Sequence, residues 1–353
     1  MALIKFLSGI FGSKEKKPDQ PPPVLSYEGN TLSPKPGDTV LDTLLEAGFP
    51  IPNSCRSGAC QSCMMMADPS TRDNLPSASQ EPLTQAERDQ GLFLPCCTLM
   101  TGSLNVSMPG DLLHPSHEAT ISSVTPLNNQ VMGLRLSLKS GLNYHPGQFV
   151  NLRFTDANQQ QVQRSYSLAS VPGLDQELEF HIKLIENGVA SQWLSQDAQA
   201  GQTVTLEGPH GHCYFNDDQA DLPTLLLAGL GTGLAPLWGI ARDALQRGYK
   251  GDIHFLVGAK SPQGLYLIDQ LQALANQHSQ IKLAFLVQES SNSEGPWQAA
   301  DIYDYCQQLD IDYSRTGVFL CGAESFVQKM KKACFMKGTS MRNIYADVFV
   351  STS

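Results

Sequence analysis

The sequence lacks any apolar run long enough to cross a membrane as a helix. A spanning helix needs about 20 consecutive apolar residues, and no stretch of this chain approaches that length. Hydrophobic residues still make up 41% of the composition, which is enough for ordinary buried cores. The 353 residues exceed what one core normally fills, so we expect two or three domains.

The chain also lacks an excess of positive charge. It has 24 Lys and Arg against 34 Asp and Glu, a formal net charge of −10. Nucleic-acid binding depends on basic groups that neutralise phosphates, so the composition argues against a nucleic-acid partner. An acidic balance is compatible with docking onto a basic patch of another protein.

A disulfide framework is the third missing feature. Nine cysteines are present, but five of them show no framework spacing: Cys97, Cys213, Cys306, Cys321 and Cys334. Thiols stay reduced in the cytosol, so we expect a cytoplasmic protein.

The other four cysteines form the most specific pattern in the sequence. Cys55, Cys60 and Cys63 make a C-x4-C-x2-C loop, and Cys96 follows at a distance. This is the ligand spacing of plant-type [2Fe–2S] clusters. Small residues fill nearly every gap in the loop, so backbone N–H groups can point at the cluster sulfurs. A zinc site is the alternative, but structural zinc usually takes paired C-x2-C units, so the pattern favours one-electron transfer through iron.

Two adjacent thiols compete for the fourth ligand position. The segment Leu94-Pro-Cys96-Cys97 resembles the Leu-x-Cys segment of plant-type ferredoxin domains, and this resemblance favours Cys96. Upstream of the loop, apolar residues at helical spacing over 39–47 predict a short helix, with Asp38 or Thr39 as its cap.

The N-terminal segment has an amphipathic pattern followed by positive charge. Apolar residues recur at i, i+3, i+4 and i+7, and lysines follow: Leu3, Phe6, Leu7, Ile10, then Lys14, Lys16 and Lys17. Such a segment can lie on an anionic membrane surface, which would give residues 1–17 a peripheral membrane contact. A disordered or self-docked tail is the simpler interpretation. No small-x-small cleavage site precedes the lysines, which argues against a signal peptide.

Shifts in pattern divide the chain into a tail and three domains. Residues 1–23 form the tail and a Pro-rich linker. Residues 24–108 hold the cysteine pattern and end in a short alternating strand. Over 114–220, short alternating strands with turn signals predict a small antiparallel β-barrel. Over 221–353, strands alternate with helices, which predicts a parallel α/β sheet.

The predicted barrel contains a polar segment suited to a phosphate-bearing ligand. Arg164, Tyr166 and Ser167 combine a cation, an aromatic ring and a hydroxyl, and alternation sends Arg164 and Tyr166 to one face. About 20 residues later, Gly188 and Ser191 open a helical stretch. The N–H groups and dipole at such a start favour a phosphate.

A glycine-rich turn follows the first strand of the C-terminal domain. The predicted strand over 224–228 runs into Gly229-Leu-Gly231-Thr232-Gly233-Leu-Ala-Pro and then into a helix. The glycines let the backbone approach a pyrophosphate, and the proline suits the first helical turn. A leucine stands where the third glycine of G-x-G-x-x-G would be.

These two motifs together resemble the ferredoxin–NADP reductase superfamily. Its flavin domains carry R-x-Y-S/T with a downstream G-x-x-S, and its nucleotide domains carry G-x-G-T-G-x-A-P. The resemblance implies FAD as the flavin, with Arg164 on its phosphate and Tyr166 packed on the isoalloxazine. It places Ser167 near the flavin N5, and Gly188 with Ser191 at the pyrophosphate.

Further resemblances follow in the C-terminal domain. Lys260 ends the next predicted strand, where a nucleotide ribose would lie, although relatives usually have Arg there. Cys321 matches the family's Cys-Gly strand end, whose thiol lies near the nicotinamide. Asp347 and Phe349 match the segment that closes over the flavin, with Glu usual at the first position and Phe349 a candidate shield. We predict that Ser167, Cys321 and Asp347 position the reacting rings. A solvated lysine, a buried core thiol and a core phenylalanine are the alternative interpretations.

Over about residues 24–353 the chain resembles the three-domain reductase components of bacterial multicomponent oxygenases. The resemblance implies a multidomain α+β and α/β protein: a β-grasp-type ferredoxin domain, an antiparallel β-barrel flavin domain and a parallel-sheet α/β nicotinamide domain. It implies that NAD(P)H reduces FAD, which passes electrons singly through the cluster to a protein acceptor. The stretch after Glu289 lacks the Arg or Lys that would pair a 2′-phosphate, so we expect NADH rather than NADPH.

The acceptor is expected to be an oxygenase component, and the reductase a monomer. A deoxysugar dehydratase or a membrane redox complex is an alternative acceptor. A hypothesis of a different class is a redox-sensing binding protein, in which the cluster only controls association. Rapid NADH-dependent reduction of ferricyanide and cytochrome c separates these classes, because a sensor should turn over negligibly.

Overall fold

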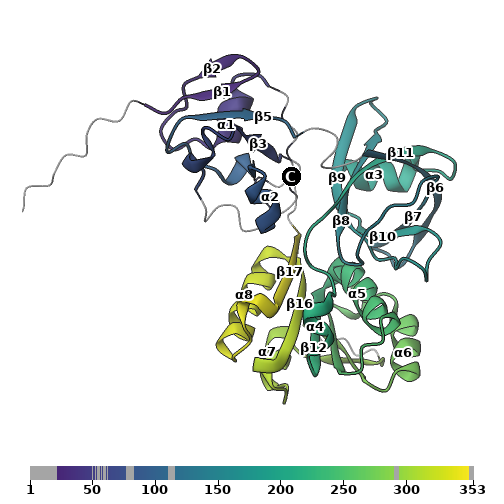
Figure 1. The fold of residues 1–353 in the computed structure, drawn as a ribbon. Coiled ribbons are helices and arrows are strands. Elements are labelled where there is room, and N and C mark those ends of the chain that lie inside the picture. The colour runs from purple at the N-terminus through teal and green to yellow at the C-terminus, as the bar shows by residue number, and fades with distance from the viewer. Residues whose placement is uncertain are drawn as a thin grey trace, which may run out of the picture.

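The computed structural model describes residues 22–49, 51, 53, 56, 58, 61, 63–76, 83–109, 116–289 and 294–349. The predicted ligands Cys55 and Cys60, and the amphipathic segment 1–17, lie outside the described residues. The described strands form three sheets in three lobes (Figure 1). Within these ranges, no helix combines the length and the apolar character that a membrane crossing requires.

The first lobe is a five-stranded mixed sheet in the order β2-β1-β5-β3-β4. Its strands are β1 (Leu25–Tyr27), β2 (Asn30–Leu32), β3 (Met65–Ala67), β4 (Leu92–Phe93) and β5 (Leu104–Ser107). Its helices are α1 (Val40–Glu46) and α2 (Gln85–Asp89), with 3₁₀ turns η1 (Arg72–Asn74) and η3 (Pro95–Cys97). The strand expected at the end of the domain forms as β5, and it lies inside the sheet because it pairs in parallel with β1 and antiparallel with β3.

Helix α1 forms where the sequence predicted it. Thr39 is its cap and shares a capping box with Asp42, which satisfies N–H groups at the start of the helix. The buried face carries Val40, Leu41 and Leu44, which join the same core as the strands. A helix packed on a mixed sheet is the expected β-grasp arrangement, and the expectation is confirmed.

The second lobe is a six-stranded sheet in the order β10-β7-β6-β11-β8-β9, with every pair antiparallel. Its strands are β6 (Ser116–Pro126), β7 (Val131–Leu138), β8 (Phe149–Thr155), β9 (Gln161–Ser167), β10 (Leu178–Lys183) and β11 (Thr203–His210). Helix α3 (Val189–Gln192) continues into the π-turn η4 (Trp193–Asp197). The end strands β9 and β10 contact each other, so the sheet curls into the expected barrel around one apolar core.

The third lobe is a six-stranded parallel sheet in the order β15-β14-β13-β12-β16-β17. Its strands are β12 (Thr224–Leu230), β13 (Asp252–Ala259), β14 (Ile281–Val287), β15 (Trp297–Ala299), β16 (Thr316–Ala323) and β17 (Ile344–Phe349). Its helices are α4 (Asp217–Ala220), α5 (Leu234–Gln246), α6 (Ile268–Gln277), α7 (Ile302–Gln308) and α8 (Glu324–Met336), and its 3₁₀ turns are η5 (Gly231–Gly233), η6 (Pro262–Gly264), η7 (Tyr313–Arg315) and η8 (Met341–Asn343).

Helices cover both faces of this parallel sheet. Apolar residues of α5 and α6 join one core, and those of α7 and α8 join a second core on the other face. The chain order runs outward from β12 to β13 and β14 and then returns to β16 on the other side of β12. Ligands of such sheets bind at the carboxyl ends of the strands where the order reverses, which here is the end of β12 and β16.

Polar contacts and close packing join the second and third lobes. Arg242 of α5 makes two hydrogen bonds with the Asp175 carboxylate, at 2.9 and 2.7 Å. Gly239 lies so close to the barrel that a Cβ there would sit 3.1 Å from the Ala169 carbonyl oxygen. Between the first lobe and the rest, Glu87 Oε2 lies 3.8 Å from His212 Nε2.

Candidate active site

The structure brings together the three residues predicted to position the reacting rings. Ser167 ends β9 of the barrel, Asp347 lies on β17, and Cys321 lies near the end of β16. The Ser167 Oγ donates a hydrogen bond of 2.6 Å to Asp347 Oδ2. Cys321 is the register partner of Asp347 in the β16–β17 pair. The carboxyl ends of β16 and β17 therefore meet the end of a barrel strand.

The charge state of this group is set by burial. Burial raises the pKa of Asp347 to about 6, and the hydrogen bond from Ser167 partly opposes that rise. Cys321 is fully buried, which raises the pKa of its thiol well above the ordinary value. The Cys213 Sγ lies 3.7 Å from the Cys321 Sγ and adds to that rise. At neutral pH the site therefore holds a neutral thiol beside a carboxylate that titrates near pH 6.

The glycine turn lies directly against this group. A Cβ added to Gly233 would overlap the carbonyl oxygen of Cys321, so only glycine fits there. Gly231 has a left-handed φ of +55°, and nothing lies within 4 Å of where its Cβ would be. The turn is thus packed on its inner side and open on its outer side, which fits the close approach of a pyrophosphate. Thr232 lies between the two glycines, and Gly229 is one of the last residues of β12.

The residues predicted for the flavin lie on β9 and around α3. Tyr166 is half-buried, and burial raises the pKa of its hydroxyl. Arg164 is half-buried too, and its Nη1 donates to the Gln163 carbonyl at 2.8 Å. Gly188 is the N-cap of α3, and the Ser191 Oγ accepts from the Ile185 N–H at 2.7 Å. Because α3 contacts β9, a guanidinium and helix-start amides share one region, a donor set that fits the phosphates of FAD.

Two further predicted residues lie at strand ends of the third lobe. Phe349 is half-buried at the end of β17, as the register partner of Ala323. Lys260 follows β13, and its Nζ lies 3.2 Å from Glu289 Oε1.

The described part of the cysteine loop fits a cluster. Arg56, Gly58 and Gln61 have positive φ values of 53°, 84° and 53°. Non-glycine residues rarely adopt this region, so Arg56 and Gln61 mark tight turns of the loop backbone. Cys63 and Cys96 are 3% and 8% exposed in one core.

Both Cys96 and Cys97 lie where the fourth cluster ligand is expected. Cys97 is half-buried beside Cys96, with 3.6 Å between the two sulfurs. Cys96 remains our prediction for the fourth ligand.

Two contacts were missed by reasoning from the sequence. Cys213 carries no spacing signal in the sequence, yet its Sγ lies 3.7 Å from the Cys321 Sγ. The Arg242–Asp175 pair joins the lobes without any motif that would signal it. The turn signals around Gly208 and Gly211 could have pointed to Cys213, because they mark the chain's exit from the barrel.

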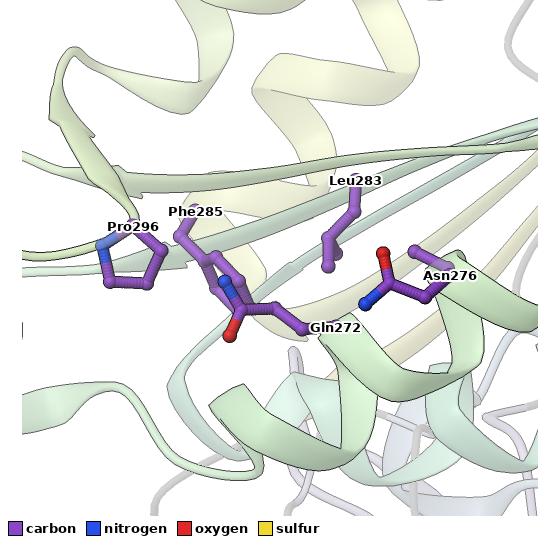
Figure 2. Close-up of a pocket in the computed structure, with 6 residues that line it drawn as sticks. Gln272, Asn276, Leu283, Phe285 and Pro296 are labelled. Carbon is purple, nitrogen blue, oxygen red and sulfur yellow. The ribbon is translucent and has the colours of Figure 1, made fainter.

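A pocket of about 360 Å³ lies away from this group, between α6 and the outer strands (Figure 2). Its lining residues are Gln272, Ala275, Asn276, Leu283, Phe285 and Pro296. None of the residues predicted for cofactor binding lines it, so we assign no cofactor to this pocket.

Each of the three lobes matches a known protein family. The 2Fe-2S iron-sulfur cluster binding domain matches residues 25–101. The oxidoreductase FAD-binding domain matches residues 118–215, and the oxidoreductase NAD-binding domain matches residues 226–332. The predicted cofactors, a [2Fe–2S] cluster, FAD and NAD(P)H, are therefore confirmed.

Relatives are similar over nearly the whole chain. The ferredoxin–NAD(P)(+) reductase component of the naphthalene 1,2-dioxygenase system of Pseudomonas putida is 30% identical, over 89% of this chain and 94% of its own. The CDP-6-deoxy-L-threo-D-glycero-4-hexulose-3-dehydrase reductase of Yersinia pestis is 27% identical, over 88% of this chain and 93% of its own. A crystal structure of an Amycolatopsis cytochrome P450 reductase superposes with a TM-score of 0.65 at 26% identity, over 94% of this chain and 100% of that one. The chain thus belongs to the family of three-domain iron–sulfur flavoprotein reductases, which carry electrons from NAD(P)H through FAD and a [2Fe–2S] cluster to a protein acceptor.

Proposed function

We propose that this chain is the reductase of a multicomponent oxygenase, with NADH as electron donor and an oxygenase component as acceptor. The meeting of Ser167, Asp347 and Cys321 beside the glycine turn is the observation that supports a nicotinamide–flavin reaction here. The naphthalene dioxygenase reductase, similar over nearly its full length, supports the oxygenase as acceptor.

The chain's own residues would orient the reactants at this point. A bound flavin would supply the chemistry that links two-electron hydride transfer from the nicotinamide to one-electron transfer into the cluster. The Ser167 hydroxyl donates its hydrogen bond to Asp347, so the lone pairs of its oxygen would be free to accept from the N5–H that the flavin carries once it is reduced. Asp347 holds that hydroxyl in one direction. Cys321, neutral and buried, would form part of the apolar packing behind the nicotinamide ring and needs no charge.

The same proposal assigns the remaining predicted residues. Arg164, Gly188 and Ser191 bind the flavin phosphates, Tyr166 and Phe349 pack against its ring, and Lys260 lies by the nucleotide ribose. The nucleotide pyrophosphate rests on the turn formed by Gly229, Gly231, Thr232 and Gly233. The cluster ligands are Cys55, Cys60, Cys63 and Cys96.

The test of the enzymatic function is NADH oxidation with ferricyanide and with cytochrome c. Both should be reduced rapidly, and flavin released by heat should run as FAD on chromatography. The variant Ser167→Ala should slow reduction by NADH about tenfold or more, with its flavin still bound, because the hydroxyl that meets the flavin edge is lost. Negligible turnover by the wild type would contradict the proposal and favour a redox sensor.

The acceptor is tested by copurification. Tagged reductase should bring down an oxygenase component, and adding that component should couple NADH oxidation to substrate oxygenation. The Yersinia pestis relative favours a second candidate, a deoxysugar dehydratase as acceptor. Capture of a dehydratase instead, with coupled reduction of its product, would replace the first candidate by the second.

Two further expectations belong to the same proposal. We infer a monomer, which light scattering of the purified chain checks. A peripheral membrane contact through residues 1–17, which lie outside the described residues, would appear as binding to anionic liposomes that deletion of the segment abolishes.

A further inference from the structure

An ion pair lies at the carboxyl ends of β13 and β14, beyond the last paired residues of these strands. Lys260 Nζ and Glu289 Oε1 are 3.2 Å apart, and their side chains are 80% and 59% exposed. The Glu289 N–H also donates to the Lys260 carbonyl at 2.8 Å. The pair is therefore held in register by the backbone while both charged ends face solvent.

The position of this pair relates it to the nucleotide. β13 lies next to β12, whose end forms the glycine turn. In dinucleotide-binding sheets, an acidic side chain beyond the neighbouring strand bonds the ribose 2′-hydroxyl of NAD, whereas a cation there accommodates the 2′-phosphate of NADP. This chain places one charge of each sign at that edge, so neither rule applies alone.

We propose that Glu289 makes the reductase select NADH by neutralising Lys260 and repelling a 2′-phosphate. The inference rests on the proposed function, in which the nucleotide lies across the glycine turn. With Glu289 in place, the lysine offers a 2′-phosphate no net positive charge. Without it, the same lysine becomes a binding partner for NADPH.

A second carboxylate close by does not take over this role. The Asp301 Oδ2 accepts from the Gln288 side chain at 2.9 Å, and its Oδ1 accepts from the Tyr303 N–H at 2.9 Å. Asp301 is thus committed to capping α7. Glu289 is the acidic group that contacts the lysine.

The size of the effect follows from the charges. A 2′-phosphate carries a charge of about −2, and one carboxylate about 6 Å away in water changes its binding by about tenfold. Solvent-exposed charges are screened, so the effect should shrink as ionic strength rises. NADH has no charge at this position and should respond little.

The experiment uses the full-length holoprotein and compares NAD(H) with NADP(H). The variants are Glu289→Gln, Lys260→Gln, the double variant, and Asp252→Asn as a matched control. Asp252 is exposed at the opposite end of β13, about 26 Å from Lys260 at about 3.3 Å per residue. Dissociation constants for NAD⁺ and NADP⁺ come from titration calorimetry, and kcat/KM for NADH and NADPH from ferricyanide reduction.

Glu289→Gln should tighten NADP⁺ binding and raise kcat/KM for NADPH by about tenfold at low salt, with NAD⁺ and NADH changed less than about twofold. Adding Lys260→Gln to Glu289→Gln should abolish the gain in NADP⁺ affinity and in kcat/KM for NADPH. Asp252→Asn should leave the binding and oxidation of both coenzymes unchanged. Equal changes for both coenzymes, or none for NADP⁺, would overturn the inference. Failure of the wild type to bind or oxidise either coenzyme would instead contradict the proposed function.

Discussion

Replacement of Asp347 by asparagine tests the electrostatics of the site directly. The carboxyl group is half-buried between the barrel and the parallel sheet, and it accepts the Ser167 hydroxyl. Asparagine keeps the shape and an oxygen that can accept the same hydrogen bond, but it carries no charge. The substitution therefore isolates the cost of ionising this group in the folded protein.

The magnitude follows from the pKa, which burial raises from the ordinary 3.8 to about 6. Because the folded state holds the proton more tightly, the stability contributed by Asp347 is present below pH 3.8 and is lost as the pH rises through 6. The whole difference corresponds to about 3 kcal/mol. About half of it, roughly 1.4 kcal/mol, is lost between pH 5 and pH 8. Asp347→Asn should therefore gain about that much free energy of unfolding, relative to the wild type, across this interval.

The assay is urea denaturation of both holoproteins at several pH values from 5 to 8, followed by near-ultraviolet circular dichroism. Asp301→Asn is the matched control, because hydrogen bonds hold the pKa of Asp301 below its ordinary value and it stays ionised throughout this range. The free energy of unfolding of Asp301→Asn should differ from that of the wild type by the same amount at pH 5 and at pH 8. A constant difference for Asp347→Asn as well would show that Asp347 ionises normally and would refute the reasoning.

Three further predictions concern the cluster, the joint between the lobes and the glycine turn. Cys96→Ser should lose the visible absorption of the cluster while Cys97→Ser keeps it; an intact spectrum in Cys96→Ser would refute the ligand choice. The variant Arg242→Met removes the guanidinium that pairs with the Asp175 carboxylate. That carboxylate is only 24% exposed and keeps one hydrogen bond, from the Val171 backbone N–H. A double-mutant cycle with Asp175→Asn, measured by urea denaturation, should therefore give a coupling free energy of about 1–3 kcal/mol. A coupling near zero would mean that the pair does not stabilise the joint. The variant Gly233→Ala must displace the glycine turn from Cys321. Its affinity for NAD⁺, measured by calorimetry, should therefore fall at least tenfold while FAD stays bound. An unchanged affinity would show that the turn does not bind the nucleotide.

Local patterns in the sequence determined much of the fold, because they depend on residues close together in the chain. Cysteine spacing predicted the cluster, alternation predicted the barrel strands, and the change to alternating strands and helices predicted the parallel sheet. A helix cap at Asp38 or Thr39 and the glycine turn after β12 also followed, since each needs only a few consecutive residues; the structure shows that the cap is Thr39. The roles of individual site residues came from resemblance and stay predictions.

Only the tertiary structure decided which distant residues meet. Ser167 and Asp347 are 180 positions apart, and Cys213 and Cys321 are 108 apart. Their contacts depend on the order of strands in two sheets and on how the barrel packs against α5, which no local pattern encodes. Strand order likewise placed β5 inside its sheet and set Glu289 beside Lys260. The sequence thus determined which cofactors the chain can hold, and the packing of its lobes determined which side chains share the place where they react.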